Sequence, residues 1–78
     1  MNFSYNLSQL KPGQRAVVKC LKTNEAMKGR LQDLGLTEHT EVLCLGRSPM
    51  GDPSAYLIRG AVIAIRAADS RKIILKTD

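Results

Sequence analysis

Residues 27–36 constrain the fold of this chain more than any other stretch, because they specify a helix together with its end. Met27, Leu31 and Leu34 recur at i, i+4 and i+7, which places them on one helical face. Gly35 then occupies the position at which a helix ends in a left-handed residue. We therefore predict a short helix whose apolar stripe lies in the core.

The predicted helix runs from about Asn24, a natural N-cap, to Leu34. A helix stop at Gly35 would bring Leu36 against the last turn of the helix. Gly29 lies inside the helix and costs about 1 kcal/mol relative to Ala. Two interpretations stay open. Either Gly29 lies close to another backbone, which we favour, or the helix is weakly specified and depends on its packing.

Most of the remaining chain has the pattern of short strands. Runs rich in β-branched and aliphatic residues, bounded by glycine, proline and polar residues, occur at 15–21, 41–47, 56–59, 62–66 and 73–75. Phe3, Tyr5 and Leu7 alternate with polar residues and indicate a further edge strand or flap. Short strands at this spacing predict one mainly β domain over residues 1–78. We expect a small barrel of five to six strands, with one inserted helix and a short helical turn near Ala68.

The sequence contains no recognisable catalytic or cofactor-binding motif. Its seven acidic residues are spread singly, and His39, the only histidine, falls in a predicted exposed turn. Glycine-rich phosphate-binding motifs are absent. Cys20 and Cys44 have no metal-type spacing and are interpreted as small buried strand residues. We predict that the protein is not an enzyme and has no cofactor, no metal site and no disulfide.

The net charge of +5 leaves two alternative functions to consider. A small basic barrel could bind nucleic acid, but the twelve Lys and Arg residues are scattered and there are only one Phe and two Tyr to stack on bases. A metal-bridged oligomer through His39 or a cysteine is the second alternative. The chain has no signal-peptide pattern and no apolar run of about 20 residues, so we expect a cytoplasmic location.

Two further features favour docking to another protein. Arg30 lies beside the apolar stripe of the predicted helix. The stretch 48–54 combines two prolines with a glycine and predicts an exposed loop, with Met50 at its tip. Loops on a rigid scaffold commonly carry recognition residues.

The order of several motifs resembles the FeoA family, the small accessory proteins of bacterial ferrous iron transport. These motifs are LKPGQ at 10–14, RLQDLGL at 30–36, MGDP at 50–53, YLIRG at 56–60 and IAIR at 63–66. The resemblance covers roughly residues 7–75. It implies an SH3-like barrel with a helix inserted after the first strand, and a cytoplasmic role beside the permease FeoB, which has a cytoplasmic GTP-binding domain.

The resemblance carries no catalytic or metal-binding residues onto this chain. Where the family usually has glycine in the turn after the helix, this chain has Glu38 and His39, and histidine tolerates a positive φ at modest cost. We expect a surface that binds the cytoplasmic part of FeoB and no nucleic acid. The predicted partner-binding residues are Arg30, Leu36, Met50, Asp52, Pro53 and Arg59.

Overall fold

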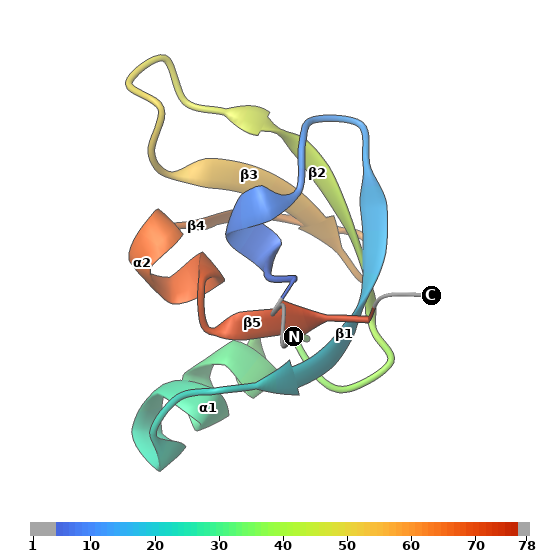
Figure 1. Ribbon diagram of the computed structural model, residues 1–78, viewed down its shortest axis with the longest axis vertical. Coiled ribbons are helices and arrows are strands. Elements are labelled where there is room, and N and C mark those ends of the chain that lie inside the picture. Colours follow the sequence, from blue (N-terminus) through green and yellow to red (C-terminus); the bar gives the residue numbers. More distant parts are fainter. Residues whose placement is uncertain (1–4, 77–78) are drawn as a thin grey trace.

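A computed structural model describes residues 5–76 and shows a single curled antiparallel sheet with short helices around it (Figure 1). The helices are η1 (Leu7–Gln9, a 3-10 turn), α1 (Glu25–Asp33) and α2 (Ala67–Ser70). The strands are β1 (Arg15–Leu21), β2 (Glu41–Arg47), β3 (Ser54–Ile58), β4 (Ala61–Ile65) and β5 (Ile73–Leu75). The mainly β class, the inserted helix and the short helical turn are confirmed.

The strand order is β4-β3-β2-β1-β5, and β1 contributes to both halves of the sheet. Its first residues pair with β2, whereas the part from Val18 onwards pairs with β5 after a register shift. Within residues 5–76 no pairing joins β4 to β5, so the predicted barrel is not closed. The N-terminal segment lies against β5 instead, because the Leu75 N–H donates to the Tyr5 carbonyl at 2.7 Å and Asn6 bridges Ile74.

Among the described residues, this contact of Tyr5 and Asn6 with β5 is the part of the predicted N-terminal edge strand or flap that can be followed. Phe3, on which part of that prediction rested, lies outside the described residues. The chain turns into η1 directly after Asn6, whose side chain accepts a hydrogen bond from the Ser8 N–H. This local capping bond favours the turn over a continued strand.

Both ends of α1 are where the sequence places them. The Asn24 side chain accepts a hydrogen bond from the Met27 N–H at 2.8 Å, as an N-cap does. At the other end Gly35 has φ +100°. The Gly35 N–H donates to the Gln32 carbonyl at 2.9 Å, and the Leu36 N–H donates to the Leu31 carbonyl at 3.0 Å. This is the hydrogen-bond pattern of a Schellman stop.

Two expectations about α1 were wrong. Leu34 was expected in the core but is 45% exposed, because it is the C-cap residue at the end of the apolar stripe and lines an open hollow beside Leu31. Gly29 was expected to lie close to another backbone, yet a Cβ built on it would meet nothing within 4 Å. Only Leu31 of α1 is fully in the core, with Met27 half-buried beside it.

The core fills the concave side of the sheet. Its buried members come from every strand, from η1 and α1, and from the segments that follow these two helices: Leu7, Leu10, Val18, Leu31, Leu36, Val42, Cys44, Tyr56, Ile58, Ile65, Ile73 and Leu75. The Tyr56 hydroxyl donates to the Leu7 carbonyl at 3.4 Å, which ties η1 to β3. Both cysteines are free thiols; Cys44 is buried as predicted, and Cys20 is only half-buried. Burial raises the pKa of the Cys44 thiol.

Candidate functional site

Strands β2, β3 and β4 carry apolar side chains on both of their faces. The inward set, which includes Val42, Tyr56 and Ile58, belongs to the core. The residues between them point the other way, and the strand register sets Leu43 opposite Leu57 and Leu57 opposite Val62. We call the outward set the outer sheet face: Leu43, Leu45, Ala55, Leu57, Val62 and Ala64.

No described element covers the outer sheet face. Val62 is 67% exposed and Leu45 is 44% exposed. Each of them lies beside half-buried apolar neighbours rather than alone, and contiguous exposed apolar surface of this kind marks interaction sites more often than scattered single residues do. The face is therefore the strongest candidate for a functional surface in the described chain.

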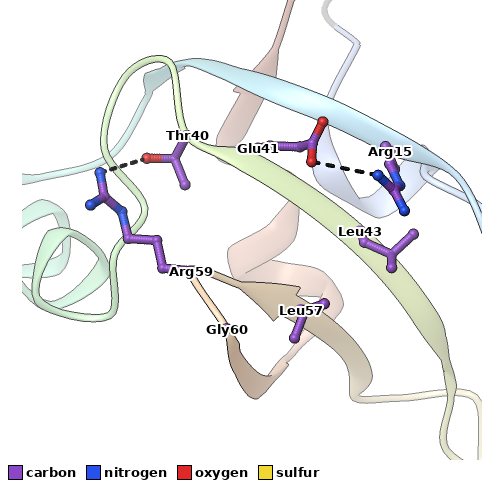
Figure 2. A pocket seen from close by; sticks show the side chains of 7 residues that line it. All are labelled: Arg15, Thr40, Glu41, Leu43, Leu57, Arg59 and Gly60. Atoms are coloured by element: carbon purple, nitrogen blue, oxygen red, sulfur yellow. Dashed lines mark hydrogen bonds and ion pairs between the residues drawn. The ribbon is translucent and has the colours of Figure 1, made fainter.

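Two hollows extend the outer sheet face at its ends. The first has a volume of about 390 Å³ and contains Leu43 and Leu57 between charged neighbours (Figure 2). It is lined by Arg15, Thr40, Glu41, Leu43, Leu57, Arg59 and Gly60. The second, of about 300 Å³, lies under the β2–β3 loop and is lined by Leu45, Gly46, Arg47, Ser48, Pro53, Ser54, Ala55 and Ala64.

Arg59 is held in place at the rim of the first hollow. It has φ +50° and forms, with Gly60 at φ +83°, the turn between β3 and β4. Its guanidinium donates to the hydroxyls of Thr37 and Thr40 at 3.2 and 3.3 Å. Its aliphatic stem lies over Gly35, where a Cβ would come within 3.1 Å of the Arg59 Cδ. The helix stop and the hairpin turn thus fix one cation beside the hollow.

The second charged feature of this rim is the pair formed by Arg15 and Glu41. Their closest nitrogen and oxygen atoms are 3.9 Å apart, and both side chains are well exposed (Figure 2). An exposed pair of this kind contributes little to stability, about 0–1 kcal/mol. The two side chains are therefore free to exchange this contact for one with a bound partner.

The residues predicted to bind a partner fall in separate places. Leu36 is fully buried, because the Schellman stop turns its side chain into the core, and this removes it from any docking surface. Asp52 accepts a hydrogen bond from the Ala67 N–H at 2.9 Å and so caps α2, which gives this side chain a structural role. Met50 is 93% exposed at the tip of the β2–β3 loop.

Three predicted residues lie at hollows. Pro53 lines the hollow under the β2–β3 loop, and Arg59 lines the one in Figure 2. Arg30 is exposed on α1 and lines a third hollow, of about 190 Å³, together with Ala64. Pro53 and Arg59 therefore border the two hollows that extend the outer sheet face, and Arg30 approaches that face only at Ala64.

Sequence reasoning missed the centre of that face, Leu43, Leu57 and Val62. A signal was present, since residues 42–45 are apolar without interruption. In a strand such a run means that both faces carry apolar side chains. Which of the two faces another element covers is a property of the tertiary structure.

Catalysis or metal chemistry finds no support in the residues that the structure describes. Within residues 5–76 no three His, Cys, Asp or Glu side chains lie close enough to hold a metal ion together. His39 has the positive φ, +72°, that its position in the turn requires, and its Nδ1 lies 2.6 Å from the Lys76 Nζ. Neither the nucleic-acid nor the metal-bridged alternative gains an observation in its favour.

Fold and surface together define a small SH3-like β domain with an uncovered apolar sheet face. The FeoA domain model matches residues 5–77, so the chain belongs to the FeoA family, which supports a role in ferrous iron transport. None of the described helices is long and apolar enough to cross a membrane.

Solved FeoA structures share this fold. The FeoA protein of Chlorobium tepidum is 33% identical over 90% of this chain and 67% of its own, with a TM-score of 0.83. The zinc-complexed FeoA of Stenotrophomonas maltophilia, described as a prokaryotic SH3 domain protein, is 25% identical over 94% of this chain and 91% of its own, with a TM-score of 0.82. A FeoA-like protein of Clostridium acetobutylicum is 24% identical over 97% of this chain and 88% of its own, with a TM-score of 0.85. A comparison with curated protein sequences gives no match.

Proposed function

We propose that this protein is a non-enzymatic, cytoplasmic accessory protein of bacterial ferrous iron uptake that docks on the cytoplasmic part of the permease FeoB. Family membership supports the transport role. The observation that carries the docking is the outer sheet face, where Leu43, Leu57 and Val62 form an uncovered apolar row across three strands.

The outer sheet face has the composition of a protein interface. Its centre is aliphatic, and its rim carries Arg15, Arg47 and Arg59 with Glu41 as the one acidic residue lining the two hollows. Interfaces of moderate affinity combine an apolar centre with a charged rim, and the rim governs the association rate. With the net charge of +5, this rim favours a partner whose contact surface is acidic.

The β2–β3 loop is the second element that such a partner would touch. Pro53 borders the outer sheet face, and Met50 is 93% exposed at the tip of the same loop, with a flexible side chain suited to irregular partners. Asp52 supports the loop through its hydrogen bond to α2 rather than through a contact of its own.

The test is a titration of the ¹⁵N-labelled chain with the cytoplasmic domain of FeoB, followed by amide shifts. Three variants introduce the same negative charge at different exposed sites: Val62→Glu on the outer sheet face, Met50→Glu on the loop and Ala26→Glu on α1. We expect Val62→Glu to weaken binding at least about tenfold, since it puts a charge into an apolar contact. Ala26→Glu is the matched control and should bind like the unaltered chain.

Each outcome decides one part of the proposal. Loss of binding in Met50→Glu with unchanged binding in Val62→Glu would move the docking site to the loop. Equal weakening by Val62→Glu and Ala26→Glu would mean that net charge, and not the apolar face, governs binding. Failure of the unaltered chain to bind the domain at all would refute the docking function.

A further inference from the structure

Strand β4 ends the sheet and has an uncovered edge. The sheet order places β4 and β5 at its two ends, and Tyr5 with Asn6 lies on the free side of β5. Among the described residues no backbone group pairs with the outer side of β4. In Figure 1, β4 runs behind β3 and leads into α2. One sheet edge is thus covered by the chain itself, and the other is left open.

The turn before β4 determines which of its backbone groups face outward. Arg59 and Gly60 both have positive φ, as in a type I′ turn, so Ile58 and Ala61 form a hydrogen-bonded pair. Antiparallel pairs alternate, which makes Leu57 with Val62, and Ala55 with Ala64, the non-hydrogen-bonded pairs. The N–H and C=O groups of Val62 and Ala64 therefore point away from β3, toward the open edge.

Nothing in β4 protects this edge from pairing with another strand. Natural edge strands usually carry a charged residue, a proline or a bulge that blocks pairing. The sequence of β4, AVIAI, has no charge and no proline, and its pairing with β3 shows no register shift. Ala61, Val62 and Ala64 are all exposed. An edge of this kind is suited to accept a strand.

Helix α1 lies across from one end of the open edge. Met27, Arg30, Leu31 and the C-cap residue Leu34 line the hollow of about 190 Å³ together with Ala64, Ile65 and Arg66 at the end of β4. Leu34, which is 45% exposed, and Leu31 give this hollow apolar walls. An added strand would therefore find a place for a side chain between α1 and β4, as in other sites where a peptide extends a sheet.

Charges around the edge distinguish between two possible occupants. Arg59 precedes β4, Arg66 follows it and Arg30 faces the hollow, with Asp69 as the one acidic residue there. Within residues 5–76 the one ion pair joins Arg15 to Glu41, so the guanidiniums of these three arginines form none. Antiparallel pairing of two copies about Ile63 would set Arg66 of each copy beside Gly60 and Arg59 of the other, which like-charge repulsion disfavours. The charges favour an acidic partner segment over a second copy.

We propose that the open edge of β4 binds an extended segment of the partner as an added strand, with aliphatic side chains over the outer sheet face and acidic residues near Arg59 and Arg66. This inference rests on the proposed docking function for the identity of the partner. It adds the mode of binding: backbone hydrogen bonds to Val62 and Ala64 provide affinity, and the flanking arginines select the charge of the segment.

Hydrogen exchange of the ¹⁵N-labelled full chain tests the mode of binding directly. In complex with the FeoB cytoplasmic domain, the amides of Val62 and Ala64 should exchange at least about tenfold more slowly, because they become hydrogen-bonded. The Ile63 amide, which already pairs with Tyr56, is the internal reference for a general stabilisation. Complex formation with unchanged exchange at Val62 and Ala64 would overturn the added strand and leave docking by side chains intact.

A synthetic peptide separates this inference from the proposed function. The probe is a short segment of alternating valine and threonine flanked by glutamates, with a lysine-flanked copy as its control. Protection of Val62 and Ala64 by the acidic peptide alone supports the added strand even if the permease domain does not bind. Protection by neither the peptide nor the domain overturns it.

A backbone variant provides the complementary measurement. Ala64→Pro removes one outward N–H without removing a hydrogen bond to β3, and proline is accepted on such edges. We expect Ala64→Pro to bind about tenfold more weakly than Ala64→Ser, which changes the same side chain but keeps the N–H. Amide shift dispersion verifies the fold of both variants. Undiminished binding by a folded Ala64→Pro variant would show that no strand is added at this edge.

Discussion

Two glycines of the helix region should respond to the same substitution with opposite sign. Gly29 lies in the interior of α1, and a Cβ built on it meets nothing within 4 Å. Alanine at this position therefore adds helix propensity and no clash. The expected gain is about 1 kcal/mol in the free energy of unfolding. For a domain of this size such a gain raises Tm by about 4–8 °C.

Gly35 combines a strained backbone with a crowded environment. Its φ is +100°, and a Cβ would lie 3.1 Å from the Arg59 Cδ and 3.4 Å from the Ile58 Cγ2. The backbone alone makes alanine unfavourable by about 1–2 kcal/mol. The Arg59 stem can move away from the new methyl group, but it then gives up its position over the helix end. Gly35→Ala should therefore lower Tm by at least as much as Gly29→Ala raises it.

Urea denaturation at fixed pH, followed by far-UV circular dichroism, measures both variants on one scale. Equal m-values would confirm that the midpoints report stability rather than a change in the unfolded state. A neutral or destabilising Gly29→Ala would refute the conclusion that the helix is open at this position. A neutral Gly35→Ala would refute the conclusion that the left-handed stop defines the end of α1.

Two further predictions concern the β2–β3 loop and the core. Asp52→Ala should lower the free energy of unfolding by about 1 kcal/mol, because the Ala67 N–H loses its hydrogen-bond partner. Asp52→Asn keeps a side-chain acceptor and should retain most of this stability. Thermal unfolding of both variants measures the difference, and equal losses would argue against the cap. Burial raises the pKa of the Cys44 thiol, so above about pH 8.5 the unfolded chain loses this proton while the native chain keeps it. The protonated Cys44 thiol therefore contributes its full stabilisation below that pH, and this contribution declines as the pH rises toward the folded-state pKa. Urea midpoints at neutral and alkaline pH should show this decline in the unaltered chain and not in Cys44→Ala.

The elements that the sequence predicted well are those with local signals. Asn24 and Gly35 specify the two ends of α1 through hydrogen bonds within a few residues, so the helix could be placed before any tertiary contact was known. The strands β1, β2 and β5 have the bounds that their aliphatic runs indicated. The family resemblance, which depends on the order of short motifs, was confirmed by the domain match.

The errors all concern which side of an element is covered. Leu34 shares a helical stripe with Leu31, yet the C-cap geometry leaves it half in solvent. Leu36 was considered for a partner and is fully buried, because its own helix stop uses it. Closure of the barrel depends on whether the two end strands meet, and Tyr5 and Asn6 lie on the side of β5 where such pairing would have to form. Strand patterns alone do not show whether β4 or the N-terminal segment lies beside β5.

The open edge of β4 that we propose for docking exists because the N-terminal residues Tyr5 and Asn6, and not β4, lie beside β5. Because Tyr5 and Asn6 lie against β5, residues 5–76 protect one edge of the sheet and leave the aliphatic edge of β4 open. The helix inserted after β1 then faces one end of that open edge through Leu34 and Arg30. Its stop carries the stem of Arg59, whose guanidinium is fixed by Thr37 and Thr40 at the other end of β4. The cations around the open edge, of which Arg59 is held in place, repel a second copy and attract an acidic segment, which an edge that was only an aggregation hazard would not require. The helix that makes the fold recognisable in the sequence is, on this reasoning, also the element that makes the edge selective.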